Sequence, residues 1–381
     1  MAVLAGGALA LAAVSVGEAG GRLMFTGTYT RGESRGIYAF RFDDATGKLS
    51  PIGLAAETRN PSFLVTSADG RLLFAVNEIS DYGGDRSGSV TSFAVDAETG
   101  KLTQLSNQST RGADPCHLAL DRTGRFLGVA NYTGGSVAVL PVSGEGRLGP
   151  PVAFFQHEGR GTDPKRQEGP HAHQVVFTAD NRFLVVTDLG LDGLVVYRFD
   201  ERTGSLTPHE PPIARVAAGS GPRHFVFHPD GKRAFVINEL SSTVTALTWD
   251  VGAGTFRASA SVSTLPAGFK GRNSTAEIAL HPGGRFLYGS NRGHDSIAAF
   301  AVDQKKGLAL VEVEPTGGQA PRHFIIDESG RWLIAANQAT GNLAVFAVDQ
   351  KTGALTPAAT SVRAETPVCV VLAPSSSGAP R

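Results

Sequence analysis

Ionisable side chains interrupt an otherwise repetitive, glycine-rich sequence at a few places. His171 and His173 stand two residues apart, and Arg223, Glu239 and Arg292 follow further along the chain. A histidine or carboxylate tuned towards neutral pH can take a proton from water, and arginines can hold an anion or stabilise an oxyanion. These five residues are the candidate catalytic groups, and the chemistry that their types allow is anion binding combined with proton transfer.

Other polar residues occupy positions where we expect contact with a substrate. These candidates are Glu277, Arg322, His224, His323, Asn131, Asn238 and Asn291. His224 and His323 share an equivalent position with His117, so a repeated structural hydrogen bond is the competing interpretation for these three. The asparagines recur at the same point of five repeats, so stabilisation of a turn competes with binding.

The sequence contains no clear signal for a metal site or a cofactor site. His171 and His173 have the spacing of two residues on one face of a strand, but no third ligand is evident, and we predict no metal. No Gly-x-Gly-x-x-Gly segment follows a strand and opens a helix, so no nucleotide cofactor is indicated. The two cysteines, Cys116 and Cys369, offer no zinc site and are expected to lie too far apart for a disulfide.

The elements that position these residues belong to a unit that recurs seven times, roughly every 50 residues. Each unit has a basic residue at a turn and, six positions later, a polar residue that ends an apolar segment. The pairs are Arg22/Thr28, Arg71/Asn77, Arg125/Asn131, Arg182/Asp188, Lys232/Asn238, Arg285/Asn291 and Arg331/Asn337. Thr-Gly turns close a further hairpin in several units, for example Asp44 to Gly47 and Asp349 to Gly353.

This pattern predicts an all-β fold, a seven-bladed β-propeller of four-stranded antiparallel blades. The first unit lacks its first strand, whereas residues 367–372 are a first strand with nothing after it. The two ends should therefore pair in one blade and close the ring, which removes exposed sheet edges. Because the chain reverses at each turn, the starts of the first strands and the ends of the second strands should meet at one mouth of the central channel.

The net charge and the N-terminal segment limit which partners and which cellular locations we expect. Lys+Arg and Asp+Glu are both 35 in 381 residues, so the net charge is 0 and no nucleic-acid partner is expected. The uncharged run 1–16 predicts an export signal cleaved near Ala19, although a basic n-region is missing, and it is too short to span a membrane. We expect a leader at 1–19, one propeller at 20–373 and a flexible tail at 374–381, in a monomer that is periplasmic or extracellular, or cytoplasmic if the leader is not functional.

Three segments, 221–240, 168–200 and 290–303, together resemble the seven-bladed propeller lactonase family over roughly residues 22–372. They contain Gly-Pro-His-x-His, Gly-Pro-Arg-His, Asn-Glu and Ser-Asn-Arg in this order. The family includes one type of 6-phosphogluconolactonase and the fungal carboxy-muconate lactonising enzymes. The resemblance implies a substrate pocket at the channel mouth, no metal requirement and a lactone that carries an acidic group. A His, two Arg and a Glu proposed to act in the muconate enzymes match the His171/His173 motif, Arg223, Arg292 and Glu239.

The resulting hypothesis is hydrolysis of an acidic sugar lactone by water, with Glu239 or His173 as the base and Arg223 and Arg292 holding the anion or the oxyanion. Lactone formation by the same groups, as in muconate cyclisation, is the alternative reaction. A propeller in the cell envelope that binds a ligand or partner without catalysis is the alternative class. A calcium-dependent sugar lactonase fits less well, since its acidic and amide ligands are not evident as a set.

Overall fold

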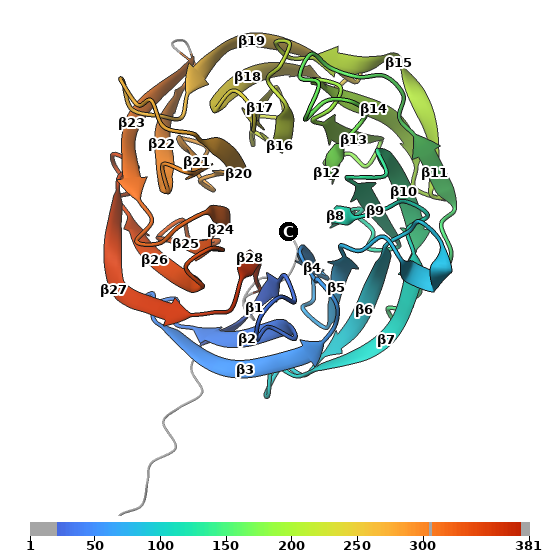
Figure 1. The fold of residues 1–381 in the computed structure, drawn as a ribbon, viewed down its shortest axis with the longest axis horizontal. Coiled ribbons are helices and arrows are strands. Elements are labelled where there is room, and N and C mark those ends of the chain that lie inside the picture. The colour runs from blue at the N-terminus through green and yellow to red at the C-terminus, as the bar shows by residue number, and fades with distance from the viewer. Residues whose placement is uncertain (1–20, 305–306, 375–381) are drawn as a thin grey trace, which may run out of the picture.

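The computed structural model describes residues 21–304 and 307–374, which form seven four-stranded antiparallel sheets around a central axis (Figure 1). Each sheet is a blade, and we name the blades A to G in ring order. From the innermost strand outwards they are A, β28 (Pro367–Leu372), β1 (Arg22–Thr28), β2 (Gly36–Phe42) and β3 (Leu49–Glu57); B, β4 (Leu64–Thr66), β5 (Leu72–Asn77), β6 (Ser89–Val95) and β7 (Leu102–Ser109); C, β8 (Pro115–Leu120), β9 (Phe126–Asn131), β10 (Ser136–Pro141) and β11 (Ala153–Gln156); D, β12 (Ala172–Phe177), β13 (Phe183–Asp188), β14 (Gly193–Asp200) and β15 (Ser205–Arg215); E, β16 (Pro222–Phe227), β17 (Arg233–Asn238), β18 (Thr243–Asp250) and β19 (Thr255–Ser263); F, β20 (Ser274–Leu280), β21 (Phe286–Arg292), β22 (Ser296–Asp303) and β23 (Gly307–Pro315); G, β24 (Pro321–Ile326), β25 (Trp332–Asn337), β26 (Asn342–Val348) and β27 (Leu355–Arg363).

The predicted seven-bladed propeller and its closure by the two chain ends are confirmed. In blade A the last strand, β28, pairs with the first, β1, with Phe25 opposite Val371 and Gly27 opposite Cys369. Cys369 and Cys116 are both free, as expected. The predicted leader at 1–19 and residues 375–381 of the predicted tail lie outside the described residues. Within the described ranges, no helix has the length and apolar character needed to cross a bilayer, and the one short 3-10 helix, η1, spans Tyr82–Gly84.

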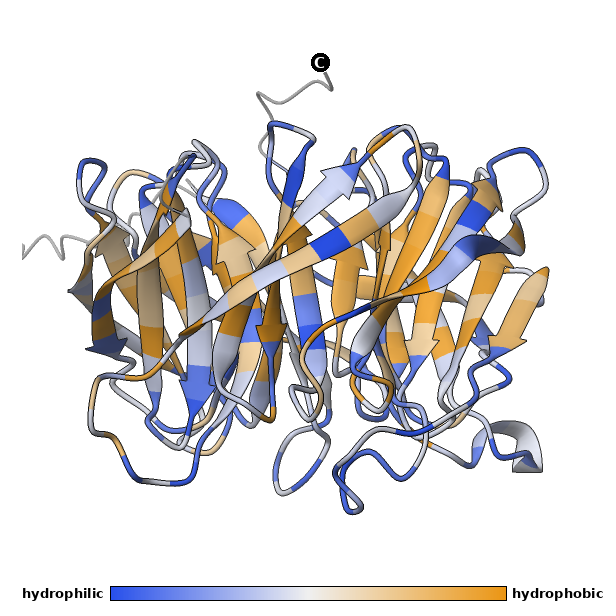
Figure 2. Cartoon of the chain, turned by 90° about the horizontal axis from the view of Figure 1, so that it is seen from above, coloured by the Kyte–Doolittle hydropathy of each residue, from blue (hydrophilic) through white to orange (hydrophobic). Residues whose placement is uncertain are grey.

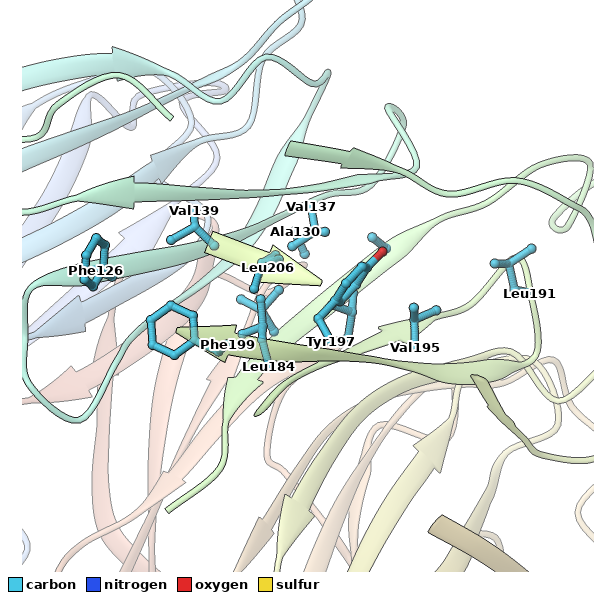
Figure 3. Packing of buried hydrophobic residues seen from close by; sticks show 13 residues of the cluster. Phe126, Ala130, Val137, Val139, Leu184, Leu191, Val195, Tyr197, Phe199 and Leu206 are labelled. Atoms are coloured by element: carbon cyan, nitrogen blue, oxygen red, sulfur yellow. The ribbon is translucent and has the colours of Figure 1, made fainter. Parts of the chain in front are cut away.

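The hydrophobic core lies between neighbouring blades rather than inside a single sheet. Between blades C and D, for example, Val139 from β10 packs with Leu184, Phe199 and Leu206 from blade D (Figure 3). Alternation along each strand sends every second side chain into such an interface, and each fully buried residue of this size contributes about 1.5–3 kcal/mol. Figure 2 shows the result, with apolar residues along the strands and hydrophilic residues gathered in the turns at both faces.

The Thr-Gly turns form as predicted, with one correction in blade A. There the carboxylate that accepts the turn's backbone N–H groups is Asp43, not Asp44, and Gly47 takes a φ of 72°. Asp44 instead forms an ion pair of 2.8 Å with Arg22 on the neighbouring strand. The turn therefore requires the carboxylate four residues before the glycine, which is the spacing that Asp349 and Gly353 also have.

A β-bulge near the start of the innermost strands changes which residues reach the channel. In blades C, D, E and G the register skips one residue directly after the first pair, as between Pro222 and His224 in β16. A bulge places two consecutive residues on the same side of a strand. Arg223 and His224 accordingly both face the channel, since Arg223 contacts Glu239 at the mouth and His224 contacts Glu277 deeper inside.

Candidate active site

The mouth of the channel is built around one buried carboxylate, Glu239, which follows β17 in blade E. Its oxygens lie 2.6 Å from Arg166 Nη2, 3.2 Å from Arg223 Nε and 2.9 Å from Arg292 Nη2. We call these four residues the Glu239 cluster. Burial alone would raise the pKa of Glu239, but Arg292, Arg223 and Arg166 outweigh it and lower the pKa to about 2. Glu239 is therefore a fixed negative charge at neutral pH.

Two arginines of this cluster are held rigidly. Arg223 Nη1 donates to the carbonyl of Ala276 at 2.7 Å, and Arg292 Nη2 donates to the carbonyl of Thr275 at 2.7 Å. Arg223 is buried, and burial together with Arg322 and Arg292 lowers its pKa to about 10, which still leaves it charged at neutral pH. Each guanidinium has five N–H groups, so donors remain for a ligand after these contacts.

Arg166, the third arginine of the cluster, was not among the predicted site residues. It lies on the long connection between β11 and β12, outside the repeat, and also donates to the Tyr132 hydroxyl at 3.3 Å. The next residue, Gln167, is fully buried and ties this connection to blade D through the Leu189 carbonyl and Asp192. The signal that could have found Arg166 is the unusual length of this connection, since a long ordered loop over a scaffold often carries function.

The histidine pair reaches the mouth in two different environments. His171 stacks on Tyr132 with ring centroids 4.6 Å apart, and its Nδ1 lies 3.1 Å from the Tyr132 carbonyl. Because a carbonyl only accepts, Nδ1 carries the proton and Nε2, 3.4 Å from Glu168, is the basic nitrogen. His173 is buried beside Cys116, and burial and Arg223 lower its pKa well below the usual range.

His224, His323 and Glu277 lie deeper than the Glu239 cluster, on the channel axis. Glu277 accepts from His224 Nδ1 at 3.0 Å and lies 3.3 Å from His323 Nε2. They belong to a ring of side chains, one per blade, that we call the axial cluster. Its members are Phe63, His117, Gln174, His224, Glu277, His323 and Cys369.

The axial cluster joins neighbouring blades to one another. His117 Nδ1 accepts the Val175 backbone N–H at 3.4 Å, and His323 Nδ1 accepts that of Val370 at 3.3 Å. For His117 and His323 these contacts match the repeated structural hydrogen bond that competed with substrate binding, whereas Nδ1 of the equivalent His224 contacts Glu277 instead. The rings of His117 and Phe63, 4.1 Å apart, fill the axis. A cavity of about 880 Å³ opens on the other side of them, at the opposite end of the channel.

The candidate asparagines are fully buried within their own blades. Asn131 Nδ2 donates to Ser136 at 3.1 Å, Asn238 Nδ2 to Thr243 at 2.9 Å, and Asn291 Nδ2 to Ser296 at 3.2 Å. These side chains link the second strand to its neighbours and are not brought to the Glu239 cluster.

Arg322 reaches the mouth from blade G, and unlike Arg166, Arg223 and Arg292 it has no polar partner among the described residues. Its guanidinium lies over the Tyr29 ring, 5.4 Å from the centroid. Among residues 21–304 and 307–374, no hydrogen bond or ion pair holds it. Burial lowers its pKa, but Tyr29, Glu78 and Glu239 raise it above the usual arginine value, so it remains charged.

The described residues form neither a metal site nor a nucleophilic serine site. No group of three or more His, Cys, Asp or Glu side chains suited to a metal ion occurs there. The segment Gly32–Gly36 spells Gly-x-Ser-x-Gly, but Ser34 lies in a β-hairpin connection, and its hydroxyl pairs with Thr28 at 2.7 Å instead of with a histidine. This is not the strand-to-helix turn that activates a nucleophilic serine.

The arrangement at the mouth can bind an anion and stabilise developing negative charge next to a basic imidazole. Arg166, Arg223, Arg292 and Arg322 outnumber the carboxylates of Glu239, Glu78 and the exposed Glu168. Fixed positive groups beside a buried carboxylate form a preorganised electrostatic site.

Known proteins share this fold and are similar in sequence. A family model described as "Lactonase, 7-bladed beta-propeller" matches residues 23–372. A 6-phosphogluconolactonase of Bacillus subtilis is 40% identical over 347 residues, which cover 91% of this chain and 97% of that protein. The solved periplasmic gluconolactonase of Pseudomonas aeruginosa is 37% identical with a TM-score of 0.86, over 92% of this chain and 99% of that one. A solved putative 6-phosphogluconolactonase of Bacteroides fragilis is also 37% identical, with a TM-score of 0.85 over 93% and 98%. The chain belongs to the seven-bladed β-propeller lactonase family.

Proposed function

We propose that this protein hydrolyses a sugar lactone that carries an acidic group, as a 6-phosphogluconolactonase does. Family membership and the names of the relatives support a lactonase, which is a carboxylic ester hydrolase. The observation that carries the proposal is the Glu239 cluster, in which backbone carbonyls fix two arginines and the third, Arg166, donates to Tyr132, the residue on which His171 stacks. An ester hydrolase needs this combination of a charge-stabilising group and a proton acceptor.

In the proposed reaction, His171 Nε2 takes a proton from a water molecule as the water oxygen bonds to the lactone carbonyl carbon. Arg223 and Arg292 stabilise the negative charge that develops on the carbonyl oxygen, a contribution of about 3–4 kcal/mol for a well-placed donor. The ring C–O bond then breaks, and the imidazolium returns the proton to the leaving oxygen, which gives the free hydroxy acid. Glu239 positions the arginines, because a carboxylate with a pKa of about 2 is too weak a base for this step.

A panel of lactones tests the activity. Purified protein is assayed at neutral pH with 6-phosphogluconolactone and gluconolactone, with and without a chelator, and spontaneous opening is subtracted. We expect acceleration of at least one lactone and the same rate with the chelator. No acceleration of any lactone, or cyclisation of a carboxymuconate in place of hydrolysis, would contradict the proposal.

We also infer export to the periplasm or the outside of the cell. The supporting observations are the apolar run at the N-terminus and the periplasmic gluconolactonase among the similar structures. Expression of the full chain in a bacterium, followed by cell fractionation and N-terminal sequencing, tests this inference. Cleavage near Ala19 in the periplasmic fraction is expected, and an uncleaved chain in the cytoplasm would contradict it.

A further inference from the structure

Arg322 differs from the other arginines at the mouth in what its guanidinium contacts. Arg166, Arg223 and Arg292 all bind Glu239, whereas Arg322 has no ion pair or hydrogen bond within the described part of the chain. The unpartnered side-chain nitrogens of Arg322 are accessible to solvent. Nε of Arg292, in contrast, is buried without a hydrogen-bond partner. A guanidinium that is half-buried, charged and open to the mouth has its full set of N–H donors available for a ligand.

The Tyr29 ring holds Arg322 without using those donors. Tyr29 is itself fixed, because its hydroxyl donates to Glu78 at 2.9 Å and the Thr366 hydroxyl donates to its backbone carbonyl at 2.6 Å. The Glu78 carboxylate is thereby engaged by Tyr29 and forms no ion pair with Arg322. A guanidinium stacked on a fixed aromatic ring is oriented in advance, so that less conformational entropy is lost when it binds an anion.

Arg322 is close enough to Arg223 and Arg292 to lower their pKa values, but it is not a member of the Glu239 cluster. It is the bulge residue of β24 in blade G and corresponds to Arg223 of β16 in blade E. Arg223 is occupied by Glu239 and the Ala276 carbonyl, and it lies in the same cluster as Arg292 from blade F. A lactone whose carbonyl lies against Arg223 and Arg292 would therefore extend across the mouth towards Arg322.

We propose that Arg322, stacked on Tyr29, is the receptor for the anionic substituent of the lactone, a phosphate ester or a carboxylate remote from the reacting carbonyl. This proposal rests on the proposed function. The planar fork of the guanidinium matches two oxygens of either group, and the charge-assisted pair forms in a half-buried setting with little competition from water. Arg322 thus determines preference for acidic over uncharged lactones and takes no part in bond breaking.

The test compares kcat/KM for three lactones. These are 6-phosphogluconolactone, glucarolactone, which carries a carboxylate, and uncharged gluconolactone. In Arg322→Ala we expect a loss of roughly 100-fold for the anionic lactone that the wild type prefers, and a change below about threefold for gluconolactone. Arg322→Lys should recover part of the loss, since it keeps the charge but not the fork. The difference between the two anionic lactones identifies the preferred anion.

Arg31 provides a matched control. Its guanidinium lies 5.4 Å from the centroid of the same Tyr29 ring but is exposed, so Arg31→Ala should leave all three rates unchanged. An equal loss for charged and uncharged lactones in Arg322→Ala, or no loss for any, would overturn the proposal. If Arg322→Ala does not fold, as judged by its thermal unfolding, Arg322→Gln takes its place.

Binding measurements separate this proposal from the proposed function. Calorimetry with 6-phosphogluconate, glucarate and gluconate requires no turnover. Wild-type protein should bind at least one of the two remote-anion ligands at least about tenfold more tightly than gluconate, and Arg322→Ala should lose that difference. If no lactone is hydrolysed but this difference is present, the lactonase proposal fails and the anion receptor stands. If lactones are hydrolysed and the variant keeps the difference, Arg322 is not the receptor.

Discussion

Glu239 shows how a buried carboxylate can hold several arginines together while staying ionised. Three guanidinium groups surround its carboxylate, and they hold its pKa near 2, where it takes no proton from water at neutral pH. Its physical contribution is to offset charge repulsion, because Arg223 and Arg292 would otherwise repel each other in a buried setting. The candidate base is therefore His171, whose tautomer is set by the Tyr132 carbonyl.

Replacement of Glu239 should disturb the arginines and, through them, the rate. For Glu239→Gln and for Arg223→Ala we expect a loss of at least about 100-fold in kcat/KM for the preferred lactone in folded protein. Steady-state kinetics measures this, with thermal unfolding to confirm the fold, and Glu98→Gln on the exposed turn between β6 and β7 is the control for charge removal. Wild-type rates in both variants would remove the Glu239 cluster from the mechanism.

The pH profiles of kcat in two variants should distinguish the roles of His171 and His173. His171→Ala should lose roughly 100-fold or more in kcat and the acid limb of the kcat profile, because the proton acceptor is gone. His173→Gln should keep that limb even where its rate falls, since His173 is buried beside Cys116 and its low pKa keeps it neutral. Retention of the acid limb in His171→Ala would assign the base elsewhere.

At the scale of the strand, the repeat predicted that Arg223, Glu239 and Arg292 meet at one mouth, but not that the innermost strands present side chains at two levels. Pro-x-His and Pro-Arg-His segments mark the innermost strands, and the ends of the second strands follow from the fixed six-residue spacing. The β-bulge was not predictable from alternation, because it shifts the pattern by one residue. It puts Arg223 at the Glu239 cluster and its neighbour His224 in the axial cluster.

The role of the connection between β11 and β12 was not predicted, because a comparison of repeats gives no information about a segment that occurs only once. It supplies Arg166, whose side chain is 41% exposed although it contacts a buried carboxylate. The neighbouring Lys165 lies exposed on the same connection. Arg166 is therefore the least constrained member of the Glu239 cluster and the one that can move when a substrate enters.

Removal of Arg166 should affect substrate binding more than the chemical step. In Arg166→Ala we expect KM for the preferred anionic lactone to rise about tenfold and kcat to fall less than threefold, because Arg223 and Arg292 keep Glu239 ionised. Lys165→Ala is the matched control and should match the wild type in both constants. A large fall in kcat without a change in KM would instead place Arg166 at the reacting atoms.

At the scale of the whole molecule, ring closure brings side chains of all seven blades to one axis. Four of the histidines near that axis, His117, His173, His224 and His323, are buried, and burial is the first cause that lowers each pKa, to about 4 for His323. Their unfolded-state pKa lies near 6.5, so the unfolded chain binds more protons as the pH falls below that value. The stability that these neutral histidines contribute is therefore fully present above about pH 6.5 and is lost as the pH falls below that value.

Acid titration of the unfolding free energy checks this. We expect a decrease between pH 7 and pH 5 of up to roughly 1.4 kcal/mol per pH unit for each protonating histidine, and His117→Gln should reduce the slope. Glu239 adds nothing in this window, because its lowered pKa makes its contribution constant above its unfolded value of 4.5 and lost only towards pH 2. Equal stability at pH 7 and pH 5 would contradict the assignment of neutral histidines.

The axial cluster has a consequence for how molecules pass through the protein. The contacting rings of Phe63, His117, His224 and His323 occupy the middle of the channel, between the mouth and the cavity at the far end. For the proposed site at the Glu239 cluster, the lactone would therefore enter and its hydroxy acid would leave through the same mouth. The hydroxy acid would then compete with the next lactone for this mouth, and we expect accumulated product to inhibit hydrolysis.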